Sequence, residues 1–187
     1  MAYPVSVTVT PRVTDCDRLT VAVRLILAIP HGFLGDLLGA KASAMAAVSW
    51  FKLLIAGEHP QGIREFTLYW LRWQARTLAY TMLFVDTHPP FGDDDYPTGI
   101  EVTNPSIPRG RATIAVRLLL AVPHCALGFF LMIGWGVTTV IAWFTILFTG
   151  SYPASLLPFS TGVMRWLLRV EAYLLLLVDE YPPFALE

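Results

Sequence analysis

The sequence predicts an all-α integral membrane protein made of two tandem repeats, and three observations lead to this prediction. Of its 187 residues, 55% are hydrophobic and only 14% are charged, whereas soluble domains carry about 25% charged residues. The mean hydropathy is +0.57, and the apolar residues gather in two long runs. The second half of the chain also repeats the first. A lipid bilayer is therefore part of the solvent that this composition suits.

The repeat extends over almost the whole chain. A shift of 93 positions places Arg24 on Arg117 without a gap. Generic hydrophobicity does not match arginine, tryptophan, proline and aspartate in this way, so we infer an internal duplication. Unit one covers residues 1–93 and unit two covers residues 94–187. Other residues that coincide under the same shift are Pro30 and Pro123, His31 and His124, Trp50 and Trp143, Arg72 and Arg165, Arg76 and Arg169, and Asp86 and Asp179.

Each unit opens with a segment in which apolar and polar residues alternate. Val5, Val7 and Val9 alternate with hydroxyl residues, and Ile100 and Val102 form a weaker copy around an acidic residue. This is the pattern of a short β-strand. Because a single short strand is unstable, we expect the two copies to pair with each other. The alternative is an extended arm without a partner.

A long apolar block follows in each unit, over residues 19–56 and residues 112–149. A helix of about 38 residues would be about 57 Å long, nearly twice a hydrocarbon core of about 30 Å. We therefore expect each block to turn back as a transmembrane helical hairpin. The expected turns are Gly39–Lys41 in unit one and Gly134–Gly136 in unit two.

The third part of each unit covers residues 63–85 and 156–178, with a polar face in unit one. Arginines inside hydrocarbon cost about 2.5–3.5 kcal/mol each. We therefore expect an amphipathic helix in the membrane interface, with Trp73 or Trp166 at headgroup depth. The alternative is a third crossing. Two crossings per unit would make the repeats parallel, and three would make them inverted.

The arginines indicate the orientation in the membrane. Under the four-crossing model, most arginines lie on one side of the membrane and the hairpin turns lie on the other. The turns carry only two charged residues, Asp36 and Lys41. The positive-inside rule places an arginine-rich side in the cytoplasm. We therefore expect a multi-pass protein with both termini in the cytoplasm.

The repeated motifs resemble one known family. They read Arg-Leu-x-Leu-Ala-x-Pro-His, Trp-Phe-x-x-Leu-x-x-Gly-x-x-Pro, Arg-Trp-x-x-Arg-x-x-x-Tyr and Asp-x-x-Pro-Pro-Phe. Together they resemble a bacterial membrane family catalogued as domain of unknown function 4389, present as two copies. Unit one departs from the pattern at Lys41 and Lys52. The resemblance implies a bacterial inner-membrane protein and implies no activity.

His31 and His124 are the first candidate site residues, because each follows a proline inside an apolar run. Three roles are open. Each histidine could cap a proline kink by a hydrogen bond to backbone or to a partner helix, hold a haem or metal between the units, or relay a proton. No Cys, His or carboxylate cluster has metal-ligand spacing, so the structural role is favoured and no metal or cofactor is expected.

The arginines form two further candidate sets. Arg24 and Arg117 are expected to form intramembrane pairs with Asp86 and Asp179. The second set consists of like-charged neighbours one helical turn apart, which repel unless an anion lies between them. For this set we expect lipid phosphates as ligands. Its members are Arg72, Arg76, Arg165 and Arg169, whereas Asp93, Asp94 and Asp95 are expected to form a solvated linker.

No nucleophile elbow or phosphate-binding glycine loop is present, so we do not expect an enzyme. A net charge of -1 gives no reason to expect nucleic acid. The favoured hypothesis is a structural or accessory subunit of an inner-membrane complex, in contact with anionic lipid and with other membrane subunits or copies of itself. The alternative is a small transporter with an Arg/His path between the units, in which the two copies of the Arg-to-His segment face each other.

Overall fold

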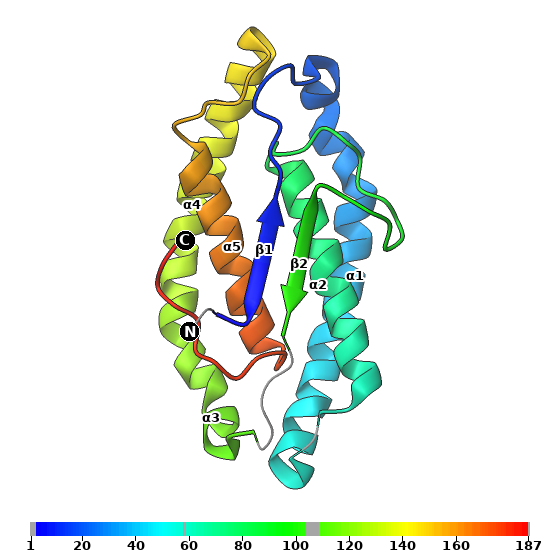
Figure 1. Ribbon diagram of the computed structural model, residues 1–187, viewed down its shortest axis with the longest axis vertical. Helices are drawn as coiled ribbons and strands as arrows, with labels where there is room; N and C mark the ends of the chain where they lie inside the picture. The colour runs from blue at the N-terminus through cyan, green and yellow to red at the C-terminus, as the bar shows by residue number, and fades with distance from the viewer. Residues whose placement is uncertain (1–2, 58, 104–108, 187) are drawn as a thin grey trace.

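The computed structural model describes residues 3–57, 59–103 and 109–186. The four longer helices run along one axis of an elongated molecule, with α2 and α5 between α1 and α4 (Figure 1). Two strands cover α2 and α5 from one side, and we call this the sheet side. In chain order the elements are β1 (Val5–Val9), α1 (Arg18–Ala56), α2 (Gln61–Thr81), β2 (Thr98–Val102), α3 (Arg111–Ala115), α4 (Arg117–Thr149) and α5 (Leu157–Leu174).

The expected pairing of the two strands across the repeat is confirmed. β1 and β2 are antiparallel, with Val7 opposite Ile100 and Ser6 opposite Glu101. Because side chains alternate between the faces of a strand, Val7 and Ile100 point into the core while Ser6 and Glu101 point outward. The sheet therefore has one apolar and one polar face.

The predicted helical hairpins are wrong. α1 is a single helix of 39 residues and α4 is a single helix of 33 residues. The glycines expected to form turns lie inside these helices, and Gly39 and Gly134 admit aromatic rings there. A Cβ on Gly39 would lie 2.9 Å from Trp70 Nε1, and one on Gly134 would lie 3.2 Å from Phe159 Cζ. These glycines therefore serve close packing against α2 and α5.

Local signals set the ends of the long helices. The Asp17 carboxylate accepts hydrogen bonds from the backbone N–H groups of Leu19 and Thr20, at 3.1 and 3.2 Å, and so caps the start of α1. Gly57 and Gly150 end α1 and α4 in the left-handed conformation, with φ of 77° and 76°. Glycine takes this conformation without strain.

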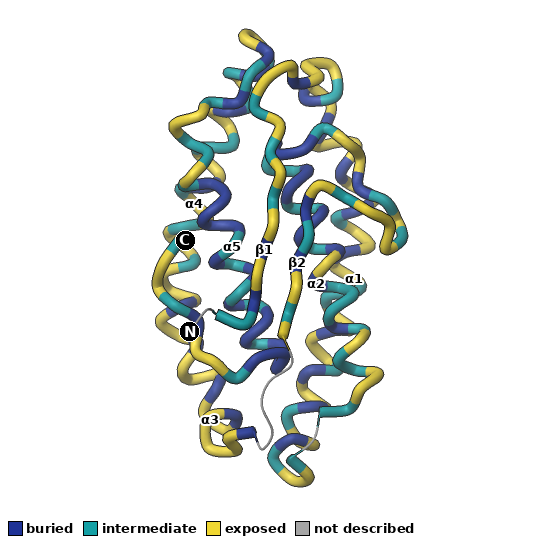
Figure 2. The backbone as a smooth tube through the Cα atoms, viewed as in Figure 1, coloured by how far each residue is buried: buried dark blue, intermediate teal, exposed yellow. Residues whose placement is uncertain are grey.

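The helices expected in the membrane interface, α2 and α5, lie instead between the sheet and the long helices, with α5 mostly buried and α2 partly buried (Figure 2). Trp73 and Trp166 are only 3% and 2% exposed, so neither is free to reach lipid headgroups. The sheet covers one face of this helix pair and the long helices cover the others. The polar face of α2 therefore contacts the sheet and the loop that leads from α2 to β2.

The two units are inverted relative to each other, which corrects the expected parallel arrangement. The start of each long helix meets the end of the other. Trp143 Nε1 donates to the Val21 carbonyl at 2.9 Å, and Trp50 Nε1 donates to the Ile114 carbonyl at 2.8 Å. Between α2 and α4 the chain returns along β2, so α4 begins at the end of the molecule where α1 ends (Figure 1).

Candidate functional site

Each unit contains a buried arginine that holds together the two ends of its helical pair. We call the first arrangement clamp one, which consists of Arg24, Tyr80, Val85 and Asp86. Arg24 is 1% exposed, and its Nη2 lies 2.6 Å from an Asp86 carboxylate oxygen. Its Nη1 donates to the carbonyls of Val85 at 3.0 Å and Tyr80 at 3.5 Å. The guanidinium also lies over the Tyr80 ring, 4.7 Å from its centroid.

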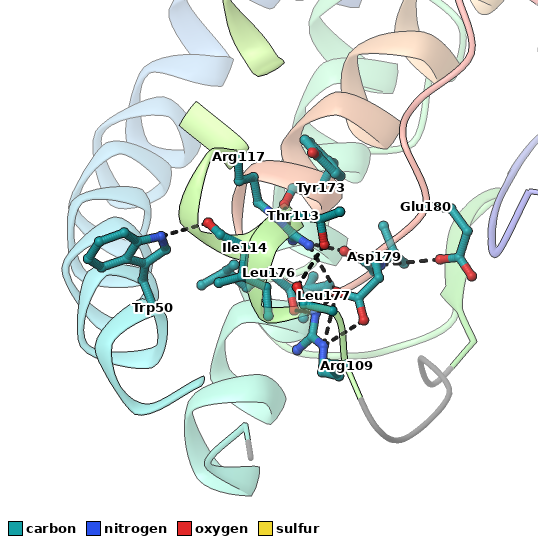
Figure 3. A network of polar contacts seen from close by, with 12 residues as sticks. Trp50, Arg109, Thr113, Ile114, Arg117, Tyr173, Leu176, Leu177, Asp179 and Glu180 are labelled. Atoms are coloured by element: carbon teal, nitrogen blue, oxygen red, sulfur yellow. Dashed lines mark hydrogen bonds and ion pairs between the residues drawn. The ribbon is translucent and has the colours of Figure 1, made fainter. Parts of the chain in front are cut away.

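Clamp two repeats this geometry with Arg117, Tyr173, Val178 and Asp179 (Figure 3). Arg117 is 1% exposed and lies 2.9 Å from the Asp179 carboxylate. Its Nη1 donates to the carbonyls of Tyr173 and Val178, at 2.8 and 2.9 Å. The expected pairs of Arg24 with Asp86 and Arg117 with Asp179 are therefore both present.

The backbone at the C-terminal ends of α2 and α5 turns so that its carbonyls reach the clamp arginines. Leu83 and Leu176 have positive φ values of 68° and 63°, which are unusual for leucine. The next residues bond back into the helix, with Phe84 N–H to Ala79 O at 2.9 Å and Leu177 N–H to Ala172 O at 3.0 Å. This turn directs the carbonyls that follow toward the guanidinium. A buried cation at a helix C-terminus is also favoured by the helix dipole.

Each clamp has a second arginine that the repeat pattern could not reveal. Arg109 donates to Asp179 through Nε at 2.8 Å and to the Leu176 carbonyl at 2.9 Å. Arg12 lies 3.5 Å from Asp86. Arg12 and Arg109 do not coincide under the shift of 93, so the alignment gave no signal for them.

The charge balance of clamp two has a consequence for pH. Burial alone would raise the pKa of Asp179, but hydrogen bonds and positive charge from Arg109 and Arg117 outweigh it and lower that pKa. The carboxylate therefore remains ionised at neutral pH, between two guanidinium groups. Asp179 is therefore the anion that the two arginines of clamp two share.

The two histidines lie in aromatic pockets closed by the Pro-Pro-Phe segments. His31 stacks on Phe91, with ring centroids 4.2 Å apart, and its Nε2 lies 3.1 Å from His88 Nε2. Trp73 covers another side of the ring, at 5.1 Å. The side-chain partners of His31 thus come from the closing segment and from α2.

His124 has the same surroundings with different polar partners. It stacks on Phe184, at 4.2 Å, and on Trp166, at 5.6 Å. Its Nε2 lies 3.1 Å from the Pro182 carbonyl, and the Tyr181 hydroxyl lies 3.1 Å from its Nδ1. Tyr181 is the repeat counterpart of His88, so both units place a hydrogen-bonding residue just before the proline pair. Within the described ranges, no three His, Cys, Asp or Glu residues are grouped as metal ligands.

The arginines expected to bind lipid phosphate differ between the units. Arg72 and Arg76 both contact the Asp93 carboxylate, at 3.0 and 3.2 Å, so this aspartate is more than a solvated linker. Arg165 donates to the Val7 carbonyl at 3.4 Å, and Arg169 lies 5.9 Å from the Tyr3 ring centroid. No carboxylate contact is found for the unit-two pair among residues 3–57, 59–103 and 109–186.

The two clamps do not face each other as expected. Arg24 lies beside the end of α4, and Arg117 lies beside Ala46 and Phe51 near the end of α1. With a rise of about 1.5 Å per residue along α1, the two arginines are about 35 Å apart. The inversion of the units causes this separation, because it sends the starts of the long helices to opposite ends.

An apolar cavity adjoins each clamp where the units meet. The first, about 260 Å³, lies between Arg24 and Trp143, and the second, about 480 Å³, lies between Arg117 and Trp50. Their lining residues correspond under the repeat with the units exchanged. Smaller side chains widen the second cavity. The residues that account for the difference are Thr139 and Val140 in the first, and Ala46 and Ala47 in the second.

These observations define a class of protein: a duplicated helical protein whose inverted halves each hold a buried arginine clamp and an aromatic histidine pocket. A family model described as "Domain of unknown function (DUF4389)" matches residues 18–92 and residues 111–185. The chain therefore belongs to this family and contains two tandem copies of its domain. No curated protein and no solved structure matches the chain significantly.

We predict that Asp179→Asn strongly destabilises the protein, because two buried guanidinium groups lose their anion. Removing one partner of a buried ion pair costs about 3–5 kcal/mol. Since the pKa of Asp179 is lowered by folding, its stabilising effect is present above its unfolded pKa of about 3.9 and is lost as the pH falls below that value. Denaturant unfolding in detergent from pH 7 to pH 3 should therefore show a flatter pH dependence for the variant. Exposed Asp95→Asn is the control, and equal curves for wild type and Asp179→Asn would contradict the assignment.

We also predict that His88→Tyr is tolerated, because Tyr181 occupies the same place in unit two. His88→Ala removes the partner of a buried imidazole and should cost about 1–3 kcal/mol. For a chain of this size, each kcal/mol lowers the thermal midpoint by about 2–4 °C. Thermal unfolding of both variants measures the difference, and an unchanged midpoint for His88→Ala would show that the contact contributes nothing.

Proposed function

We propose that the protein is a non-enzymatic structural or accessory protein of the bacterial inner membrane, with α1 and α4 in contact with lipid. The observation that carries this proposal is the exposure of the two long helices. Both are long and apolar enough to span a membrane, yet only 28% and 11% of their most apolar windows are buried. The core helix of a soluble protein would be mostly buried, so the exposure of these helices supports an apolar solvent around them.

The exposed apolar side chains support the same proposal by their location. Among the described residues, nearly every large exposed hydrophobic side chain belongs to α1 or α4. Leu19, Ile55, Leu119 and Phe148 are each more than 70% exposed. An exposed apolar surface of this extent is far larger than the isolated apolar residues of soluble proteins. The exceptions are Phe91, Val116, Tyr181 and Phe184.

The buried polar groups fit a structural role. Each clamp and each histidine pocket joins the two helices of its own unit, and the polar atoms are mostly engaged by protein partners. The Arg/His path of the transporter hypothesis requires the two arginines to face each other, and they lie at opposite ends of the molecule. The geometry therefore favours a scaffold that presents surfaces to lipid and to partner subunits.

An external anion is proposed for only one of the arginine pairs. Arg72 and Arg76 already share the Asp93 carboxylate as a counter-ion. Arg165 and Arg169 hold the equivalent place in unit two, where the residue corresponding to Asp93 is Leu186. A phosphate or carboxylate from outside the described residues would relieve the repulsion between these two arginines.

We predict that the protein behaves as an integral rather than a peripheral membrane protein. It should remain with sedimented bacterial membranes after washing at alkaline pH and with high salt, because its attachment depends on apolar burial rather than on charge. Immunodetection in the pellet and supernatant measures this. Release into the supernatant by the alkaline wash would refute the membrane proposal.

A further inference from the structure

We infer that the molecule lies in one leaflet with its long axis parallel to the membrane plane, so that the side of α1 and α4 opposite the sheet contacts hydrocarbon and the sheet faces water. This inference rests on the proposed membrane location and concerns how the protein sits there. It replaces the four-crossing and six-crossing topologies. Three features of the structure lead to it.

The first feature is the length of the apolar surface. On α1, large exposed apolar residues span Leu19 to Ile55, with an interruption between Leu37 and Val48. On α4 they run from Leu118 to Phe148. At about 1.5 Å per residue, these stretches measure about 54 and 45 Å. If α1 and α4 crossed the membrane, these stretches would fit a hydrocarbon core of about 30 Å only at tilts of about 50° from the membrane normal. Membrane-spanning helices are tilted by about 0–40°. Helices lying in the plane have no such limit.

The second feature is the position of the sheet, halfway along the long axis (Figure 1). Ser6, Thr8 and Glu101 on its outer face are exposed. In an upright molecule, these side chains and the unpaired backbone edges of a two-stranded sheet would meet hydrocarbon. Open sheet edges are not found there, because their N–H and C=O groups have no partner. With the long axis in the plane, the sheet lies in water.

The third feature is the charge at the middle of α1. Asp36 and Lys41 are both exposed and lie close to the midpoint of this helix. In an upright helix they would sit near the bilayer centre, at a cost of about 2.5–3.5 kcal/mol each. In a helix that lies in the interface, every residue is within reach of headgroups and water. Lys41 already points toward α2, with its Nζ 4.2 Å from the Phe66 ring centroid.

The inversion of the units has a different meaning in this orientation. The axis that relates the units passes between the antiparallel strands, perpendicular to the long axis (Figure 1). It therefore runs along the membrane normal, and both units contact the same leaflet in the same way. Arg165 and Arg169, beside β1, then face water, and the anion proposed for them reaches the protein from the aqueous side.

Thiol labelling from the two sides of the membrane tests the inference. In a background with Cys16→Ser and Cys125→Ser, single cysteines are placed by Thr14→Cys near the start of α1, Gln61→Cys near its end and Ser6→Cys on the sheet. All three native residues are exposed. A membrane-impermeant maleimide is applied to sealed right-side-out and inverted vesicles. We expect all three positions to label from the same side.

The outcomes separate this inference from the proposed function. Labelling of Thr14→Cys and Gln61→Cys from opposite sides, with Ser6→Cys unreactive, would overturn the in-plane orientation while leaving the membrane location intact. Protein that is not retained by alkaline-washed membranes would instead refute the proposed function. Each variant is first checked for retention in the membrane, so that misfolded variants are excluded.

A second measurement keeps the inference testable if a labelled variant fails to fold. Nitroxide labels at Leu119→Cys, Ile133→Cys and Phe148→Cys report depth along α4 through collisions with oxygen and with a nickel complex. The native side chains there are exposed by 71%, 53% and 79%. An in-plane helix predicts similar depths at all three positions. A clear maximum of depth at Ile133→Cys would instead indicate a spanning helix.

Discussion

The structure depends on satisfying two buried guanidinium groups. Arg24 and Arg117 are almost completely excluded from solvent, and an unpaired charge in that position would cost several kcal/mol. Their acceptors are the carbonyls at the end of the second helix and the aspartate that follows it. The left-handed leucines and the ion pairs together meet that requirement. Each unit is closed by its arginine, and the units then join through strands and tryptophans.

Much of this could be predicted because it depends on which residues are present. The shift of 93 identified the units, and the valine alternation identified the strands and their pairing. An arginine in an apolar run needs an anion, and Asp86 and Asp179 were the repeated candidates. His88 and Tyr181 also carried a signal, since both precede the proline pair and both can bond an imidazole.

The remaining features depend on packing, which the sequence does not display. Glycine inside an apolar run fits a turn and a close helix contact equally well, and only the position of Trp70 decides for Gly39. The hairpin prediction also assumed that an apolar helix must cross the bilayer. A helix longer than the hydrocarbon core would then have to turn back. Arg12 and Arg109 were missed because they reach equivalent aspartates from positions that do not repeat. The pairing of Asp93 depends on where its loop returns beside α2.

The central claim is that this duplicated helical body rests in one leaflet. The helices α1, α2, α4 and α5 follow the same axis (Figure 1), so their amide I transitions report a single direction. Polarised attenuated total reflection infrared spectroscopy of the protein in supported bilayers measures that direction. For an in-plane molecule, the dichroism places the helical amide I transition moment parallel to the membrane surface. Dichroism oriented along the membrane normal would contradict this account and favour a spanning protein.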